Sequence, residues 1–128
     1  MITFETSRFG SLEVSEDRII NFPFGLLGFP NLNRYVLMDY KDTPLKWLQS
    51  VDDPQVAFVV TDPKTASGEG TITFGNDVVS FLQVEKEEEL AALVILRYED
   101  DKVVANISGP LAINSSRMLG AQVILDQG

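Results

Sequence analysis

The fold is decided by a stretch in the first half of the chain, residues 35–61, which reads YVLMDYKDTPLKWLQSVDDPQVAFVVT. It contains three runs rich in β-branched and aromatic residues, at 35–40, 47–51 and 56–61, with turn residues between them. Short runs of this kind predict antiparallel strands joined by tight turns. Because Pro54 cannot donate to a sheet ladder, we expect Asp52 and Asp53 at a hairpin tip, bonded to their own backbone.

The rest of the chain repeats this pattern of short runs and turns, and it contains one helical segment. We expect a hairpin of residues 2–6 and 12–14 through Phe9-Gly10, and a second of 90–98 and 103–107 through the turn at 99–102. Asn76 or Asp77 is placed to cap a short helix ending at 84. Further strands are predicted at 19–22, 71–74, 111–114 and 121–125, a mobile or insertion-tolerant loop at 63–70, and a turn at 115–120.

Together these features predict an all-β fold, a small β-barrel-like or sandwich-like domain with at most one or two short helices. With 128 residues and 45% hydrophobic content, the chain is long enough for one core, so residues 1–128 are expected to form a single domain.

Residues 23–30, PFGLLGFP, form a loop because two prolines and two glycines forbid a long regular element. The simpler interpretation packs all four large apolar side chains of the loop, Phe24, Leu26, Leu27 and Phe29, onto the core. The alternative leaves part of the loop as an exposed apolar contact surface, since such patches mark interaction sites.

The charge balance favours a basic protein partner. Nineteen acidic against ten basic residues give a net charge of −9, which repels phosphate backbones and anionic lipid headgroups. We therefore expect no direct binding of nucleic acid and none to membranes. The same field attracts a basic protein, with an encounter rate that falls as salt rises.

The composition also removes most catalytic chemistry. The chain has no Cys and no His, so thiolate nucleophiles, imidazole bases and most transition-metal sites are excluded. The aspartates at 52, 53, 62, 100 and 101 lack the spacing of a calcium loop, and no glycine loop has the phosphate-binding pattern, so we expect no metal and no cofactor. No export signal is visible, and the apolar run 90–96 is too short to span a bilayer, which predicts a cytoplasmic protein.

Three stretches of the chain resemble the FliW family of flagellar assembly factors. They are FPFGLLGF at 22–29, WLQSVDDPQVAFVVTDP at 47–63, and Ala105-Asn106 with Pro110, Ile113-Asn114, Arg117, Gly120 and residues 122–125. The middle stretch is the most specific, because it combines Trp, Gln, two Asp and two Pro in fixed order. The resemblance covers most of the chain and is weakest at 64–90; members of the family usually continue somewhat beyond Gly128.

The resemblance implies a non-enzymatic, chaperone-like regulator of flagellum biogenesis with a small β-barrel-like domain. Members bind the RNA-binding translational repressor CsrA, and they also bind flagellin. Free flagellin occupies the FliW-like protein, and CsrA then represses flagellin mRNA. Export of flagellin releases the FliW-like protein, which antagonises CsrA, so that translation resumes.

Contact residues are predicted from the polar positions inside the resembling stretches and from the acidic run at 85–89. The candidate partner-binding residues are Asp52, Asp53, Glu85, Glu87, Glu88, Glu89, Asn106, Asn114 and Arg117. Asn106 and Asn114 have an alternative role in capping backbone groups at strand ends. Trp47, Phe58 and Val59 are expected in the core.

Two further expectations concern the mode of action. The chain is expected to be a monomer, and its charge predicts electrostatic antagonism of a basic RNA-binding partner that needs no overlap with the RNA site. The alternative of a different class is an enzyme with paired carboxylates, or a small-ligand binder, built at the mouth of a small barrel.

Overall fold

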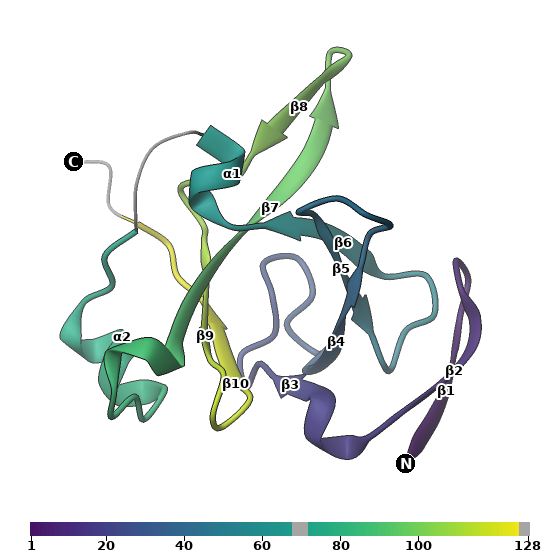
Figure 1. Cartoon of the computed structure of the whole chain (residues 1–128), viewed down its shortest axis with the longest axis horizontal. Helices are drawn as coiled ribbons and strands as arrows, with labels where there is room; N and C mark the ends of the chain where they lie inside the picture. The colour runs from purple at the N-terminus through teal and green to yellow at the C-terminus, as the bar shows by residue number, and fades with distance from the viewer. Residues whose placement is uncertain (68–71, 126–128) are drawn as a thin grey trace.

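The computed structural model of the chain describes residues 1–67 and 72–125, and within them seven strands close into a barrel (Figure 1). Neighbouring strands follow the order β6-β5-β4-β3-β10-β9-β7, and the pairing of β7 with β6 closes the ring. Their bounds are β3 Ile19–Asn21, β4 Arg34–Asp39, β5 Lys46–Ser50, β6 Ala57–Thr61, β7 Leu90–Glu99, β9 Leu111–Asn114 and β10 Leu119–Gln122. The predicted all-β, barrel-like class is confirmed.

The remaining elements lie outside the ring. A separate hairpin is formed by β1 (Ile2–Thr6) and β2 (Gly10–Val14), while β8 (Lys102–Ala105) pairs with the end of β7. The helical elements are short: α1 (Pro63–Ser67), α2 (Asn76–Phe81), and the 3₁₀ turns η1 (Glu16–Arg18) and η2 (Glu87–Glu89). None of the helices in the described part of the chain is long and apolar enough to span a membrane.

The continuous apolar run at the start of β4 is explained by burial on both faces of the strand. Tyr35 packs inside the barrel with Ile20, Phe22 and Leu48, whereas Val36 packs on the outer face with Phe4 of the β1–β2 hairpin. The hairpin therefore acts as a lid over the outside of β3 and β4. A strand covered on both faces does not need to alternate apolar and polar residues.

The hairpin of β7 and β8 projects from the barrel (Figure 1). Its turn residues, Asp100 and Asp101, have φ angles of 51° and 63°, the left-handed pair that a two-residue type I′ turn requires. Asp tolerates this conformation better than most residues do. The predicted turn between the two strands is confirmed, although β8 ends at Ala105 rather than at 107.

Two predictions between β6 and β7 are wrong. Residues 72–74 form no strand, and the predicted loop begins with the α1 helix; positions 68–71 lie outside the described residues. Pro63 begins α1 because its fixed φ suits a first helical turn. Asp62 accepts hydrogen bonds from the backbone N–H and hydroxyl of Thr65, which secures that turn locally.

The predicted helix in this region exists but is shorter than expected. α2 ends at Phe81 and its N-cap is Gly75, with no side-chain cap, so neither Asn76 nor Asp77 has the predicted role. Gln83, with a φ of 57°, then turns the chain out of the helix. The last strand is also displaced: β10 begins at Leu119 and ends at Gln122, which leaves a shorter turn after β9 than predicted.

The prediction that Trp47 lies in the core is wrong. It is half-buried on the outer face of β5, where its ring stacks on Tyr40 at 5.3 Å and carries the Arg8 guanidinium at 4.4 Å. Its cross-strand partner Val59 shares this outer face, whereas Phe58 packs against the barrel core as predicted. The alternation along β5 places Leu48, not Trp47, inside.

Candidate protein-binding surface

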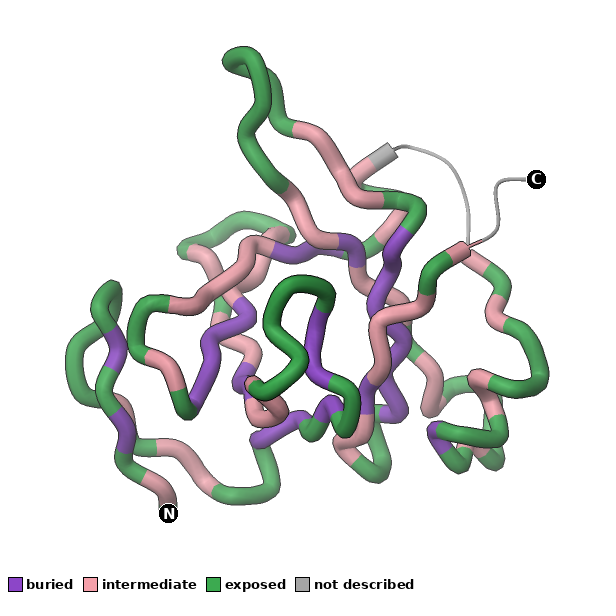
Figure 2. The backbone as a smooth tube through the Cα atoms, turned by 180° about the vertical axis from the view of Figure 1, so that it is seen from behind, coloured by how far each residue is buried: buried purple, intermediate pink, exposed green. Residues whose placement is uncertain are grey.

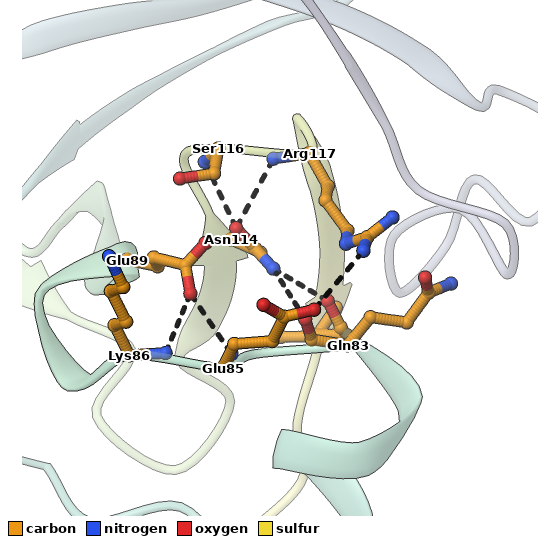
Figure 3. A network of polar contacts seen from close by, with 8 residues as sticks. Gln83, Glu85, Lys86, Glu89, Asn114, Ser116 and Arg117 are labelled. Atoms are coloured by element: carbon orange, nitrogen blue, oxygen red, sulfur yellow. Dashed lines mark hydrogen bonds and ion pairs between the residues drawn. The ribbon is translucent and has the colours of Figure 1, made fainter.

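Asn114 is the centre of a polar network that joins the segment after α2 to the turn between β9 and β10 (Figure 3). Its side-chain amide donates to the carbonyl oxygens of Leu82 at 2.8 Å and Gln83 at 3.3 Å. Its Oδ1 accepts from the backbone N–H groups of Ser116 and Arg117 at 3.0 and 3.2 Å. Because Asn114 is fully buried, it positions this surface rather than facing a partner.

The acidic run contains one structural residue, Glu89, and three exposed residues, Glu85, Glu87 and Glu88. Glu89 is half-buried, and its Oε1 accepts hydrogen bonds from the backbone N–H groups of Lys86 at 2.6 Å and Glu85 at 2.9 Å. The bond from Lys86, with others from the Ser116 hydroxyl and Glu85, lowers the pKa of Glu89. Glu85, Glu87 and Glu88 are exposed and are the members of the run that a partner can reach.

Arg117 lies at the edge of this network. Its guanidinium approaches the Glu85 carboxylate at 3.5 Å, and both side chains are largely exposed, so this contact contributes little to stability. The structure thus brings together four of the predicted residues, Glu85, Glu89, Asn114 and Arg117, from segments about 30 positions apart (Figure 3).

Asp52 and Asp53 contact other neighbours, in the loop between β5 and β6. Asp52 forms a two-pronged ion pair with Arg34, at 2.5 and 3.1 Å, which raises the pKa of the guanidinium. Asp53 accepts from the backbone N–H of Gln55, as predicted for a turn aspartate. The same prediction is wrong for Asp52, whose carboxylate bonds to Arg34 instead. Burial, with a smaller effect of Asp53, raises the pKa of the Tyr35 hydroxyl inside the barrel to about 12.

Asn106 and Gln122 form hydrogen bonds that hold a third region of the surface, the loop between β8 and β9. Asn106 Oδ1 accepts from the Gly109 N–H at 3.2 Å, which is a backbone-capping contact of the predicted kind. Gln122 donates its amide to the Gly109 carbonyl at 2.9 Å and accepts from the Leu27 N–H at 2.7 Å. Gln122 was not among the predicted site residues, although it lies in a resembling stretch.

An apolar surface that the residue predictions did not include adjoins Gln122. We call it the apolar surface and define it by Phe24, Leu27, Phe81 and Ile124, all of them exposed. Phe24 stacks on Phe81 of α2 at 5.3 Å, whereas Leu26 of the same loop is buried in the core. The prediction that the whole loop packs inward is therefore wrong for Phe24, Leu27 and Phe29, which are exposed, and the alternative of partial exposure is the one observed.

The loop that carries Phe24 and Leu27 connects β3 to β4 and runs across the barrel opening that faces the viewer in Figure 2. Its sequence signal was the alternation of large apolar residues with Gly25 and Gly28, both at positive φ. Left-handed turns at these two positions let one apolar side chain point inward while its neighbours point outward.

A hollow of about 470 Å³ lies between α1 and the start of β7. Asp62 and Glu87 line it, but the bonds from Thr65 lower the pKa of Asp62, the opposite of what a general acid needs. Among the described residues, no group of three or more Asp and Glu side chains is placed to hold a metal ion. The barrel interior is filled by side chains such as Tyr35 and Phe22.

Comparison with known proteins decides the family. The family model described as FliW protein matches residues 3–128. The chain belongs to the FliW family. The flagellar assembly factor FliW of Caldanaerobacter subterraneus subsp. tengcongensis is 34% identical over 125 residues, covering 94% of this chain and 83% of that protein. The FliW of Geobacter sulfurreducens is 35% identical over 123 residues, covering 94% and 77%.

The fold of the FliW family is also the fold of this chain. A crystal structure of the flagellar assembly factor FliW superimposes with a TM-score of 0.90 at 33% sequence identity. The alignment covers 99% of this chain and 91% of that one. Family membership makes this chain a flagellar assembly factor of the FliW type, as the sequence resemblance predicted.

Proposed function

We propose that the chain is a cytoplasmic, non-enzymatic regulator that binds the translational regulator CsrA and antagonises its repression of flagellin mRNA. In the same proposal it binds flagellin, chaperone-like, so that the two proteins compete for it. Membership of the FliW family supports this function, because the resemblance implies both partners. The chain itself is proposed to act as a monomer.

The observation that carries the CsrA part is the exposed acidic run. Glu85, Glu87 and Glu88 project from a segment that Asn114 and Glu89 hold in place. A preorganised cluster of like charges binds a cationic surface without first having to be ordered.

The ion pairs of the chain leave its acidic excess available. Arg34, Lys46, Arg97 and Arg117 each pair with a carboxylate of the chain itself, and each pair cancels one charge of either sign. The net charge of −9 is therefore unaffected by them. An RNA-binding protein is cationic where it meets phosphates, so a nearby acidic protein weakens its hold on RNA without covering the RNA site.

The test is a reconstitution with three components. Purified chain is mixed with CsrA from the same organism and run on a sizing column at low and high salt, with flagellin added in a competition lane. We expect a complex with CsrA that weakens at high salt and is displaced by flagellin. Binding to neither protein would refute the proposal, and binding without competition would refute the partner switch.

The effect on RNA is measured separately. CsrA bound to a labelled flagellin leader RNA is titrated with the chain in a gel-shift assay. We expect the CsrA–RNA band to disappear as the chain is added. We also expect that the chain mixed with the RNA alone gives no shifted band. A chain that shifts the RNA by itself would contradict the absence of direct nucleic-acid binding.

A further inference from the structure

The apolar surface groups several large, exposed hydrophobic side chains in one place. Phe24, Leu27 and Ile124 have 75, 72 and 65% of their surface accessible. Side chains of this size are rarely left in one exposed group on a protein that acts alone. It is the clustering of these side chains, and not the exposure of any single one, that indicates a binding site for a partner.

The apolar surface contains two adjoining hollows. One hollow of about 300 Å³ lies between Phe24, α2 and residues 121–124, and a second of about 320 Å³ lies between residues 24–28, Pro30 and the same strand end. Both are lined by Phe24, Gln122 and Ile124, which therefore form the ridge between them. Two adjoining hollows of this size each accept one large apolar side chain.

The surface is held in place from below. Leu26 and Leu82, both buried, anchor the loop and the end of α2, and the Gln122 side chain ties Leu27 to Gly109. The ordering cost of binding is therefore small, because the walls of both hollows exist before a partner arrives.

The charge of the lining indicates which segment fits. Among the residues that the structure describes, Asp77 is the one ionisable side chain that lines either hollow. An acidic segment would be repelled by Asp77 and by the net charge of −9, whereas a segment with a basic residue beside its apolar side chains is favoured.

We propose that the apolar surface is a docking site for a protein segment with two large apolar side chains, one for each hollow, and a neighbouring Lys or Arg that pairs with Asp77. The inference rests on the proposed function, because the segment would belong to one of the two protein partners. It adds a contact that the acidic run at 85–89 does not provide. Binding through this surface depends on apolar burial, so it resists salt more than binding through the acidic run.

The first test compares two exposed substitutions of equal chemistry. Leu27→Asp removes an apolar side chain from the surface, and Tyr98→Asp, on the projecting β7–β8 hairpin at 74% exposure, is the matched control. Affinities for CsrA and for flagellin are measured by calorimetry. We expect Leu27→Asp to weaken binding of one partner at least about tenfold, and Tyr98→Asp to change it less than about twofold. Unchanged affinity of Leu27→Asp for every partner that the wild type binds would overturn the inference.

The second test does not depend on those partners. A short synthetic peptide with two leucines and a neighbouring lysine is titrated into ¹⁵N-labelled chain, with a peptide that has serines for the leucines and one that has glutamate for the lysine. We expect amide shifts at 24–28, 76–81 and 121–124 with the first peptide and much weaker ones with the other two. If the peptide shifts amides elsewhere in the chain, or shifts none, the docking site is overturned even if the chain binds both CsrA and flagellin. If the peptide binds as expected but the chain binds neither CsrA nor flagellin, only the proposed function is refuted.

Discussion

The side-chain oxygen Oε1 of Gln122 accepts a hydrogen bond of 2.7 Å from the backbone N–H of Leu27, which lies 95 positions earlier in the chain. The other end of the same amide donates to the carbonyl of Gly109. One side chain at the end of β10 thus fixes two loops, and it sets the position of the apolar surface relative to the barrel.

Replacing Gln122 with alanine is expected to free the loop that carries Phe24 and Leu27. The Leu27 N–H loses its acceptor, so its hydrogen exchange should become much faster while amides in β4 and β5 keep their protection. Exchange followed by NMR measures this directly. An unchanged rate at Leu27 would show that the loop is held by other contacts.

Gly25 and Gly28 form a natural pair for testing how the loop is shaped. An alanine Cβ at position 25 would collide with the backbone of Phe29 and Pro30, in addition to requiring a φ of 66°. At position 28 the φ is 90° but no atom lies within 4 Å. We expect Gly25→Ala to destabilise the fold by about 2–4 kcal/mol and Gly28→Ala by about 1 kcal/mol, measured by denaturant unfolding. Equal losses would contradict the backbone collision.

The strands were predictable because their signals are local. The run at 35–61 contains its own turns, and Asp100 and Asp101 supply the left-handed turn that β7 and β8 need. The sequence predictions were wrong where contacts between residues far apart in the chain determine the structure. Trp47 lies outside because the alternation of β5 places Leu48 inside, and sequence composition alone does not fix that phase.

The candidate surface was predicted only in part for the same reason. A buried Asn114 that bonds to Leu82 and Gln83 cannot be told from an exposed one without knowing which segments meet. The exposure of Phe24 and Leu27 depends on the φ angles of two glycines and on a bond to Gln122. The acidic run, by contrast, can be recognised directly from the sequence, although the structural role of Glu89 within it cannot.

Asn114→Ala is expected to be among the more damaging polar substitutions in the chain. It leaves two carbonyl and two N–H groups without their partner near the surface of the core, which should cost about 2–4 kcal/mol in the free energy of unfolding. Asn31→Ala, at an exposed position in the loop between β3 and β4 and outside this network, should cost well under 1 kcal/mol. A loss at Asn114 no larger than that at Asn31 would contradict the role of the network.

Glu89 makes the stability of the fold depend on pH. Its folded-state pKa is below the ordinary 4.5, so its ionised form stabilises the folded state above about pH 4.5, and this contribution is lost as pH falls through the folded pKa. Glu89→Gln removes the charge at every pH. We expect the wild type to be more stable than this variant at pH 7 and the difference to shrink on acidification. A difference that is constant with pH would contradict a charge-dependent role.

The central claim, that the exposed acidic run docks a basic partner, is tested most directly by making the same change in net charge at two different places on the chain. Glu87→Lys with Glu88→Lys raises the net charge of the chain by four, and Glu13→Lys with Glu16→Lys, at exposed positions on and just after β2, raises it equally. The measurement is the affinity of each double variant for CsrA at low salt. The account predicts at least about tenfold weaker binding for the first variant and a much smaller loss for the second. Equal losses, or none, would contradict it.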